Sequence, residues 1–351
     1  MTIDVHDAIA PRAADWEALA VRAGAPPFAR PGWFAAWWSA FGSGAPLVVT
    51  TTRGGRLTGV LALRRRAGVL ASPTNAHTPG FGMLAEDASA AAALASWLFA
   101  QRPRRVQLDY VDAADPTVPE LSRAAAGAGH RMLRTVVQRS PYVALAPGED
   151  VDRRLGAKAA GNLRRNLRRL EEAGRVEVQV EATPRQLDRL LVEGFRVESS
   201  GWKAERGTAI LSSPATRRFY AALARWAADA GLLRLAFLRL DGRAIAFAFV
   251  LRDETAYYLI KGGYDPEHRR FAPGKLLFRS LMARAAASGA QRFELLGAAE
   301  PWKLEWTDRC HERILVRTYA PTVLGVADRA TQTAFLRYGR PLAKRALARV
   351  R

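Results

Sequence analysis

One stretch of this chain, residues 257–297, constrains its fold more than any other, because it joins two apolar runs through a basic loop and a helix. The first run, at 257–264, is rich in tyrosine and aliphatic side chains. A basic loop at 268–270 follows, and then an apolar segment at 273–288 that has the length of a helix. After Gly289, the second apolar run begins. The pattern predicts a strand, a basic loop, a helix and a second strand.

The start of the predicted helix has the features of an anion-binding site. Pro273 fits the first helical position, because its missing N–H group would have no partner there. The first turn of a helix presents N–H groups without intrahelical partners and the positive end of the helix dipole. The cationic side chains of Arg269, Arg270 and Lys275 lie beside this turn in the sequence. We therefore expect a phosphate or another anion to bind here.

The length and composition of the chain allow two domains. It has 351 residues, of which 49% are hydrophobic, and this is enough for a sizeable core. The turn at 147–150 separates two halves in which strands and helices alternate. We predict an N-terminal domain at 1–148, a C-terminal domain at 149–322 and a basic helical tail at 323–351.

The single cysteine and the N-terminal residues bear on the compartment. Cys310 has no second cysteine with which to form an internal disulfide, so a reducing compartment is expected. The first residues lack the basic and apolar regions of a signal peptide. The longest weakly polar run, at 88–100, is too short to cross a bilayer. We expect a cytoplasmic protein without a transmembrane segment.

The net charge of +20 leaves several partners open. A basic surface attracts nucleic acid, acidic carrier proteins, anionic lipids and phosphate-bearing cofactors alike. An arginine- and alanine-rich composition is also typical of proteins from GC-rich genomes. A predicted helix at 151–174 has a buried leucine stripe and seven cations: Arg153, Arg154, Lys158, Arg164, Arg165, Arg168 and Arg169. Its basic surface is either a solvated helix face or a docking surface for phosphates.

The N-terminal half reads as a set of α/β layers. Trp33, Trp37 and Phe41 recur at helical spacing, which favours a core stripe over a ligand platform. Segments 47–53 and 57–64 flank Gly54-Gly55 and predict a β-hairpin. The loop at 72–82 is rich in proline, glycine and polar residues, and we expect it on the surface, beside a cleft.

The order of elements after residue 175 resembles the Gcn5-related N-acetyltransferase (GNAT) fold. A predicted hairpin at 232–252 leads into the strand, basic loop and helix described above. Segment 269–274 is similar to the family's pyrophosphate loop, Arg/Gln-x-x-Gly-x-Gly/Ala, although Ala272 stands at the first glycine. Five short segments also resemble the BioF2-like and CelD-like (cellulose biosynthesis) acetyltransferases and, more distantly, the FemABX peptidyltransferases. These segments lie at 163–169, 198–203, 264–265, 273–277 and 297–306.

This resemblance implies an α/β (α+β) fold of tandem GNAT-like domains, each with a mixed, mostly antiparallel sheet flanked by helices, the N-terminal domain being degenerate. It implies an acyl-CoA-dependent N-acyltransferase, with acetyl-CoA or a longer acyl-CoA as co-substrate and no metal. The expected acceptor is an amine of a small molecule or amino sugar, in polysaccharide or cell-envelope biosynthesis.

The resemblance also implies where the donor binds. The backbone of the strand around Tyr258, Ile260, Lys261 and Gly262 would pair with the pantetheine arm. The loop and helix start would take the pyrophosphate, through Arg269, Arg270, Phe271, Ala272, Pro273, Gly274 and Lys275. Because charge-assisted hydrogen bonds exceed the dipole contribution, the cationic side chains of this loop should matter most.

For the chemical step, the resemblance points to Lys303, which would stabilise the oxyanion that forms as the amine attacks. Glu300 or Asp265 would accept the amine proton, and Tyr264 would protonate the leaving thiolate. The acceptor side would contain Glu198, Trp202, Lys203 and Arg165. The other chemistries that we considered lack their motifs: the five histidines show no metal-ligand spacing, and there is neither a nucleophile elbow nor a Walker loop.

Two other functions remain open from the sequence. One is a FemABX-like transfer of an aminoacyl group from tRNA, in which the basic face would bind RNA phosphates and affinity would fall steeply with salt. The other is a non-catalytic module that binds an acyl carrier protein or nucleic acid through the same basic face.

Overall fold

The computed structural model describes residues 1–182, 185–201, 207 and 209–334. Contacts divide the chain into two compact units that interleave in sequence. Unit 1 comprises residues 1–24, 45–137 and 313–351, and unit 2 comprises residues 25–44 and 138–312. Each unit is a mixed α/β structure with a mostly antiparallel sheet flanked by helices, and the predicted fold class is confirmed.

Unit 1 contains the N-terminal strands and the end of the described chain. Its sheet runs in the order β1 (Thr2–His6), β2 (Leu47–Arg53), β3 (Arg56–Arg66), β4 (Val69–Ala71), β6 (Arg105–Asp112) and β13 (Cys310–Tyr319), with β5 (Leu84–Ala85) beside β3. Of β13, residues 313–319 belong to unit 1 and residues 310–312 to unit 2. Its helices are α1 (Ala13–Arg22), α3 (Ala88–Ala100), α4 (Val118–Gly127) and α11 (Val323–Ala334), and Ala10–Arg12 forms the 3-10 turn η1. Only β4 and β6 pair in parallel among the adjacent strands described here.

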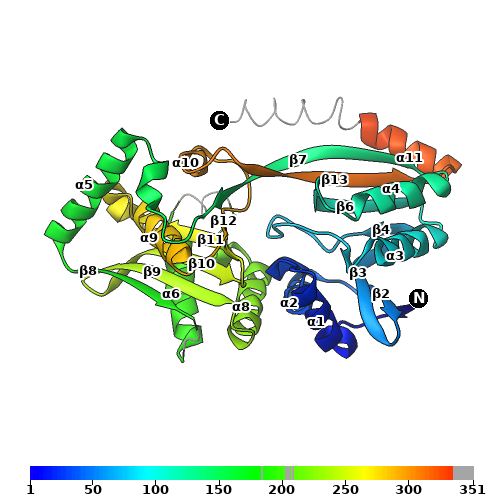
Figure 1. The fold of residues 1–351 in the computed structure, drawn as a ribbon, viewed down its shortest axis with the longest axis horizontal. Helices are drawn as coiled ribbons and strands as arrows, with labels where there is room; N and C mark the ends of the chain where they lie inside the picture. Colours follow the sequence, from blue (N-terminus) through cyan, green and yellow to red (C-terminus); the bar gives the residue numbers. More distant parts are fainter. Residues whose placement is uncertain (183–184, 202–206, 208, 335–351) are drawn as a thin grey trace. The chain divides into compact units, whose positions relative to one another are not determined.

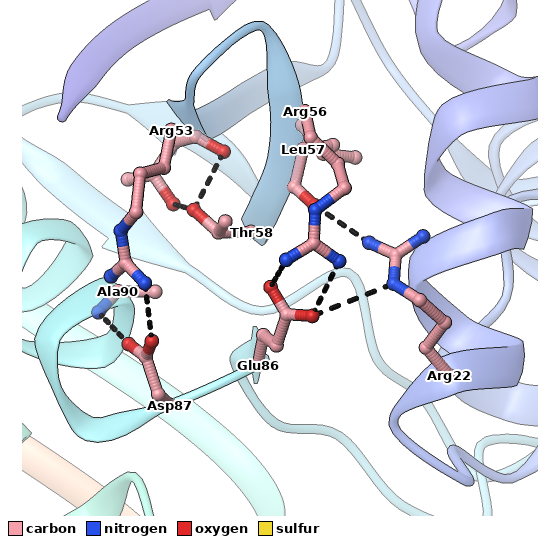
Figure 2. Close-up of polar contacts among 9 residues, drawn as sticks. Arg22, Arg53, Arg56, Leu57, Thr58, Glu86, Asp87 and Ala90 are labelled. Carbon is pink, nitrogen blue, oxygen red and sulfur yellow. Dashed lines mark hydrogen bonds and ion pairs between the residues drawn. The ribbon is translucent and has the colours of Figure 1, made fainter.

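A network of ion pairs joins the β2–β3 hairpin of unit 1 to the start of α3 (Figure 2). The predicted hairpin turns through Gly54 and Gly55, both at positive φ. Arg53 binds Asp87 at 2.9 Å, and the Asp87 carboxylate caps α3 by accepting from the Ala90 N–H at 2.8 Å. The guanidinium of Arg56 binds both oxygens of Glu86. These contacts fix the start of α3 against the hairpin.

The loop after β4, at residues 72–82, is buried, and the sequence prediction of a surface loop was wrong. Expected on the surface, it has buried residues along most of its length, including Ser72, Thr74, Thr78 and Phe81. The cause is hydrogen bonding to β6, because the Ser72 N–H donates to the Gln107 carbonyl at 2.9 Å. The loop therefore belongs to the core of unit 1.

Unit 2 contains the stretch at 257–297. Its sheet runs in the order β7 (Arg131–Ala144), β12 (Arg292–Glu294), β11 (Ala256–Tyr264), β10 (Arg243–Arg252), β9 (Leu233–Leu240) and β8 (Val176–Glu181), and these strands are labelled in Figure 1. Of β7, residues 138–144 belong to unit 2 and residues 131–137 to unit 1. Its helices are α2 (Pro31–Phe41), α5 (Ala157–Ala173), α6 (Leu187–Ser199), α8 (Pro214–Asp229), α9 (Pro273–Ala287) and α10 (Pro301–Leu304). Its 3-10 turns are η2 (Pro27–Ala29), η3 (Val151–Arg154), η4 (Ile210–Ser212) and η5 (Pro266–Phe271).

Two apolar clusters lie on opposite sides of the unit 2 sheet. Residues of α5 and α9 pack with Tyr257 and Phe293 in one cluster. Residues of α2, α6 and α8 pack with Tyr258 in the other. Because successive side chains of a strand point to opposite faces, Tyr257 and Tyr258 mark the two sides of β11.

The aromatic stripe of α2 is core, as predicted. Trp33 and Trp37 are buried, and the Trp33 ring meets Phe219 of α8 edge to face at 5.4 Å. Gly32 allows this packing, because a Cβ atom there would lie about 2 Å from the Trp226 ring. The stripe packs in unit 2, although the sequence prediction put these residues in an N-terminal domain at 1–148.

Four element boundaries also differ from the sequence prediction. β7 is one strand, whereas the sequence pattern predicts two strands, at 132–138 and 142–145. Residues 151–154 form η3 and not the start of a helix at 151–174, and α5 begins at Ala157. The final strand, which the sequence pattern predicts at 304–318, begins at Cys310, because α10 and a turn occupy the residues before it. The predicted terminal helix starts at Val323, and its remainder beyond Ala334 lies outside the described residues. Within the part of the chain that is described, no helix combines the length and apolarity needed to cross a membrane.

Candidate active site in unit 2

The parallel strands β11 and β12 separate directly before the predicted anion site. They pair through three residues each, and the last pair is Tyr258 with Glu294. Beyond this pair, β11 continues to Tyr264 along β10, whereas the Leu295 N–H donates to the Pro141 carbonyl on the β7 side. The register between β10 and β11 shifts at Ile260, which forms a β-bulge. Bulges re-aim backbone groups and are common beside active sites.

The chain enters α9 through a left-handed residue. Asp265 begins η5 by accepting from the Glu267 N–H at 3.1 Å. Ala272 then adopts φ +53° and ψ +50°, and Pro273 occupies the first position of α9. Glycine adopts this left-handed conformation without the steric cost that a Cβ atom brings, which explains why the resembled motif has glycine there. Gly274 follows, and its Cα faces the Tyr264 ring closely enough that a Cβ atom would lie 3.2 Å from it.

Cationic side chains flank the start of α9. Arg269 and Arg270 are exposed, and the Arg270 guanidinium lies 4.6 Å from the centre of the Phe271 ring. Lys275 binds both oxygens of Glu305, at 2.6 and 2.8 Å. Helix α5 packs against η5 and α9, and it adds exposed cations at Lys158, Arg164, Arg165, Arg168 and Arg169. The predicted anion loop and the arginine helix are therefore neighbours.

The side chains of Tyr258 and Phe271, two of the predicted donor-site residues, are buried in the core. Tyr258 donates to the Asp253 carboxylate at 2.7 Å, and burial followed by the Asp253 charge raises the pKa of its hydroxyl. Phe271 packs in the cluster beneath α9. Ile260 packs partly against the opposite cluster. Any contact of these three residues with a donor would therefore go through their backbone groups.

A buried carboxylate connects the end of α6 to β11. Glu198 is 1% exposed, and its Oε2 accepts from the Ile210 N–H at 2.8 Å. Its Oε1 lies 3.5 Å from the Lys261 ammonium, which also lies 5.9 Å from the centre of the buried Tyr220 ring. Burial, followed by the Glu198 charge, raises the pKa of the Tyr220 hydroxyl. Gly263 permits this approach, because a Cβ atom there would lie 2.6 Å from the Glu198 Cα.

Lys303 organises the loop that follows β12. Its buried ammonium donates to the carbonyl oxygens of Leu296 at 2.6 Å and Ala298 at 3.0 Å. Leu296 and Gly297 both adopt positive φ, at 51° and 60°. A leucine in this conformation is strained, and such strain persists where surrounding contacts impose it. Because β11 and β12 run parallel, this loop lies at the same end of the sheet as the diverging part of β11.

The other predicted acid and base residues have structural partners. Glu300 accepts from the Trp302 indole N–H at 2.9 Å and lies 3.5 Å from the Lys303 ammonium. Asp265 is buried and binds Arg243 at 2.7 Å. Trp202 and Lys203 lie outside the described residues.

One group of side chains could hold a metal ion. The ligand atoms of Asp265, Glu267 and His268 lie within 4.8 Å of one another. The Arg243 guanidinium already binds the carboxylates of Asp265 and Glu267, at 2.7 and 3.2 Å. Two of the three candidate ligands are therefore already paired with a cationic side chain.

The sequence prediction missed Glu294 and His311. Glu294 is buried on β12, and His311 Nε2 lies 3.2 Å from its Oε1. The His311 ring stacks on Tyr142 with 4.4 Å between ring centres. The available signal was the charge of Glu294 within the apolar run 293–296, because an ionised side chain in a buried strand needs a partner or a function.

Comparison with known families supports the same region. Residues 157–304, from α5 to α10, match the family described as Acetyltransferase (GNAT) domain. This part of the chain is therefore similar to that family. A search of curated proteins finds no match.

Solved structures resemble this chain over most of its length. The C-terminal domain (DUF2156) of a putative lysylphosphatidylglycerol synthetase from Agrobacterium fabrum has a TM-score of 0.59 and 14% identity, over 93% of this chain and 98% of that one. FemX has a TM-score of 0.60 and 12% identity, over 90% and 97%. L-PGS from Bacillus licheniformis has a TM-score of 0.56 and 14% identity, over 90% and 94%. At these identities the likeness shows the fold alone.

Proposed function

We propose that this protein is an acyl-CoA-dependent N-acyltransferase of the BioF2-like or CelD-like kind, acting through unit 2. The observation that carries the proposal is the separation of β11 from β12 after Tyr258 and Glu294, directly before the basic start of α9. An extended pantetheine arm can pair with the backbone of a strand that has parted from its neighbour. The start of α9, with its dipole and cations, then suits the pyrophosphate at the other end of the donor.

Each part of the site has a role in this proposal. Arg269, Arg270 and Lys275 bind the donor phosphates, and the backbone at the Ile260 bulge aligns the thioester. Lys303 places positive charge at the carboxyl end of β12, where the oxyanion forms as the amine attacks. Tyr264 is proposed as the acid for the leaving thiolate.

The acceptor is proposed to be an amine of a small molecule or amino sugar, in cytoplasmic steps of polysaccharide or cell-envelope biosynthesis. Glu198, Trp202, Lys203 and Arg165 are proposed to lie on the acceptor side. Support for this comes from Glu198 alone, which joins the end of α6 and the start of η4 to Lys261 of β11. The Glu198 carboxylate thus holds the end of α6 beside the proposed donor strand.

Calorimetry with acetyl-CoA tests the donor site. We expect the double variant Arg270→Ala, Lys275→Ala to lose affinity by at least tenfold, since each charge-assisted hydrogen bond contributes about 1.5–3 kcal/mol. Arg284→Ala is the matched control, because this exposed cation lies at the far end of α9. Unchanged affinity of the double variant would contradict the assignment of the pyrophosphate loop.

A second candidate is a FemABX-like transfer from aminoacyl-tRNA, favoured by the exposed cations of α5 beside η5. RNA binding through α5 predicts that affinity for tRNA falls steeply with salt. In the double variant Arg165→Ala, Arg169→Ala, the affinity for tRNA should depend less steeply on salt than in the wild-type chain. If acetyl-CoA binds and tRNA does not, the first candidate holds.

A further inference from the structure

Three carboxyl side chains are buried in the described part of unit 2, and they differ in how their oxygens are bound. Glu198 accepts from the Ile210 N–H and faces Lys261. Asp265 binds Arg243 and the start of η5. In Glu294, the Oε2 atom is buried without a hydrogen-bond partner among the described residues. Glu198 Oε1 makes no hydrogen bond there either, but it lies 3.5 Å from the Lys261 ammonium.

The Glu294 carboxylate is held through its Oε1 atom. Its Oε1 lies 3.2 Å from His311 Nε2 and 3.5 Å from Arg292 Nε. The buried atom without a partner is Oε2. A buried carboxylate oxygen without a donor is costly, and such groups in folded proteins commonly have a catalytic role or a missing partner. This oxygen is therefore ready to accept a proton or a hydrogen bond from a ligand.

Glu294 lies where the two parallel strands part. It is the last residue of β12 that pairs with β11, opposite Tyr258, and it also pairs with Tyr142 of β7. Directly paired residues share a face of the sheet, so Glu294 lies on the side of Tyr258, which packs with α2 and α8. The face covered by α9 and its basic loop is the opposite one. Glu294 thus lies where β11 and β12 separate, which is the proposed donor site. Its side chain is on the sheet face opposite the predicted pyrophosphate loop.

His311 connects this carboxylate to solvent. Its side chain is 25% exposed, whereas that of Glu294 is 6% exposed. Stacking on Tyr142 fixes the plane of the imidazole ring. A buried acid with a partly exposed imidazole partner can take up a proton and return it.

We propose that Glu294 is the general base of acyl transfer, and that His311 is a positioning residue that holds its carboxylate. This inference rests on the proposed function and takes the place of Glu300 and Asp265 as the base. The amine nitrogen attacks the thioester carbonyl carbon, the C–N bond forms, and the C–S bond breaks with the electron pair leaving on sulfur. One proton passes from the nitrogen to Glu294 Oε2, and the thiolate takes one proton from Tyr264. Tyr264 regains a proton from solvent as Glu294 releases its own, so the products are an amide and free coenzyme A.

The test compares Glu294→Gln with the wild-type chain, using acetyl-CoA as the donor and hydroxylamine as a small acceptor. Release of the coenzyme A thiol is measured, with the reaction without protein subtracted. We expect the variant to lose about 10²-fold or more in rate while acetyl-CoA affinity is unchanged, because a general base contributes about 10²–10⁴-fold. Glu312→Gln is the matched control, since it removes an exposed carboxylate beside His311 and should keep the wild-type rate.

Two substitutions of His311 separate positioning from packing. His311→Gln keeps an N–H donor for Glu294, and His311→Phe keeps the ring on Tyr142 without that donor. We expect the glutamine variant to retain most of the rate and the phenylalanine variant to lose it, with equal thermal stability. Equal rates in these two variants would exclude the positioning role.

The possible outcomes test this inference separately from the proposed function on which it rests. A wild-type chain that binds no acetyl-CoA overturns both. A wild-type chain that binds acetyl-CoA and releases thiol, with Glu294→Gln equally active, overturns the inference and leaves the proposed function standing. Binding without thiol release above background also overturns the inference.

Discussion

At the scale of single residues, Ala272 shows how a departure from a family motif is tolerated. It stands in the left-handed region at φ +53°, between η5 and α9, and its carbonyl accepts from the N–H groups of Lys275 and Leu276. These hydrogen bonds hold the conformation that glycine would adopt without strain. The alanine therefore keeps the geometry of the loop at a cost in stability.

We predict that Ala272→Gly stabilises the protein. A left-handed conformation costs an L-residue roughly 1–2 kcal/mol, and the greater unfolded-state freedom of glycine offsets part of the gain. The net increase in the free energy of unfolding should be about 0.5–1 kcal/mol, measured by urea denaturation. Ala283→Gly, at an exposed position within α9, is the matched control and should destabilise by a similar amount. A loss of stability in both variants would contradict the strain at Ala272.

Single residues also show the limit of sequence reasoning. The order of residues in the chain predicted Lys303 and the loop around Ala272 as site residues. Glu294 and His311 could not be paired in this way, because their contact depends on the register of β12 with β7 and on the stacking of His311 against Tyr142. Neither relation leaves a pattern in the spacing of residues.

At the scale of elements, local patterns predicted most helices and strands, and long-range packing decided the rest. The stripe on α2 correctly indicated a buried helix, but its partner, Phe219 of α8, lies far along the chain. For the same reason the loop after β4 is core, because its hydrogen bonds go to β6. Composition gives the polarity of a segment and does not identify the strand that satisfies its backbone groups.

The start of α3 offers a test at this scale (Figure 2). Asp87 both caps the helix through the Ala90 N–H and binds Arg53, which lowers the pKa of the carboxyl group. We predict that Asp87→Ala lowers the free energy of unfolding by about 1 kcal/mol, the usual value of a cap. Asp87→Asn keeps the acceptor and loses the charge, so it should cost much less, since exposed ion pairs contribute about 0–1 kcal/mol. Equal losses in thermal or urea unfolding would assign the effect to the ion pair.

At the scale of the whole molecule, the two units contain similar parallel pairs with different surroundings. In unit 1, β4 pairs with β6 in parallel, as β11 pairs with β12 in unit 2. After Ala71, however, the chain stays beside β6. Ser72 Oγ accepts from the Asp109 N–H at 3.0 Å, and the Phe81 N–H donates to the Tyr110 carbonyl at 3.1 Å. The chain itself thus occupies the edge of β6 that a donor would need.

The helix that connects the two strands of each parallel pair, α3 in unit 1 and α9 in unit 2, also differs between the units. The start of α3 has the acidic pair Glu86 and Asp87, whose carboxylates bind arginines. The start of α9 has the basic loop with Arg269 and Arg270. A carboxylate at a helix start competes with a phosphate for the same N–H groups, so α3 is unsuited to hold a pyrophosphate.

We therefore predict that each chain binds one acyl-CoA molecule, in unit 2. Calorimetric titration with acetyl-CoA should give a stoichiometry of one, and Arg270→Ala, Lys275→Ala should weaken that single event. Asp87→Asn, which removes negative charge at the start of α3, should create no second event, because the Ser72 and Phe81 hydrogen bonds still close the edge of β6. Two binding events per chain would contradict the prediction of a single site. One event that persists unchanged in the double variant would place the donor site elsewhere than the start of α9.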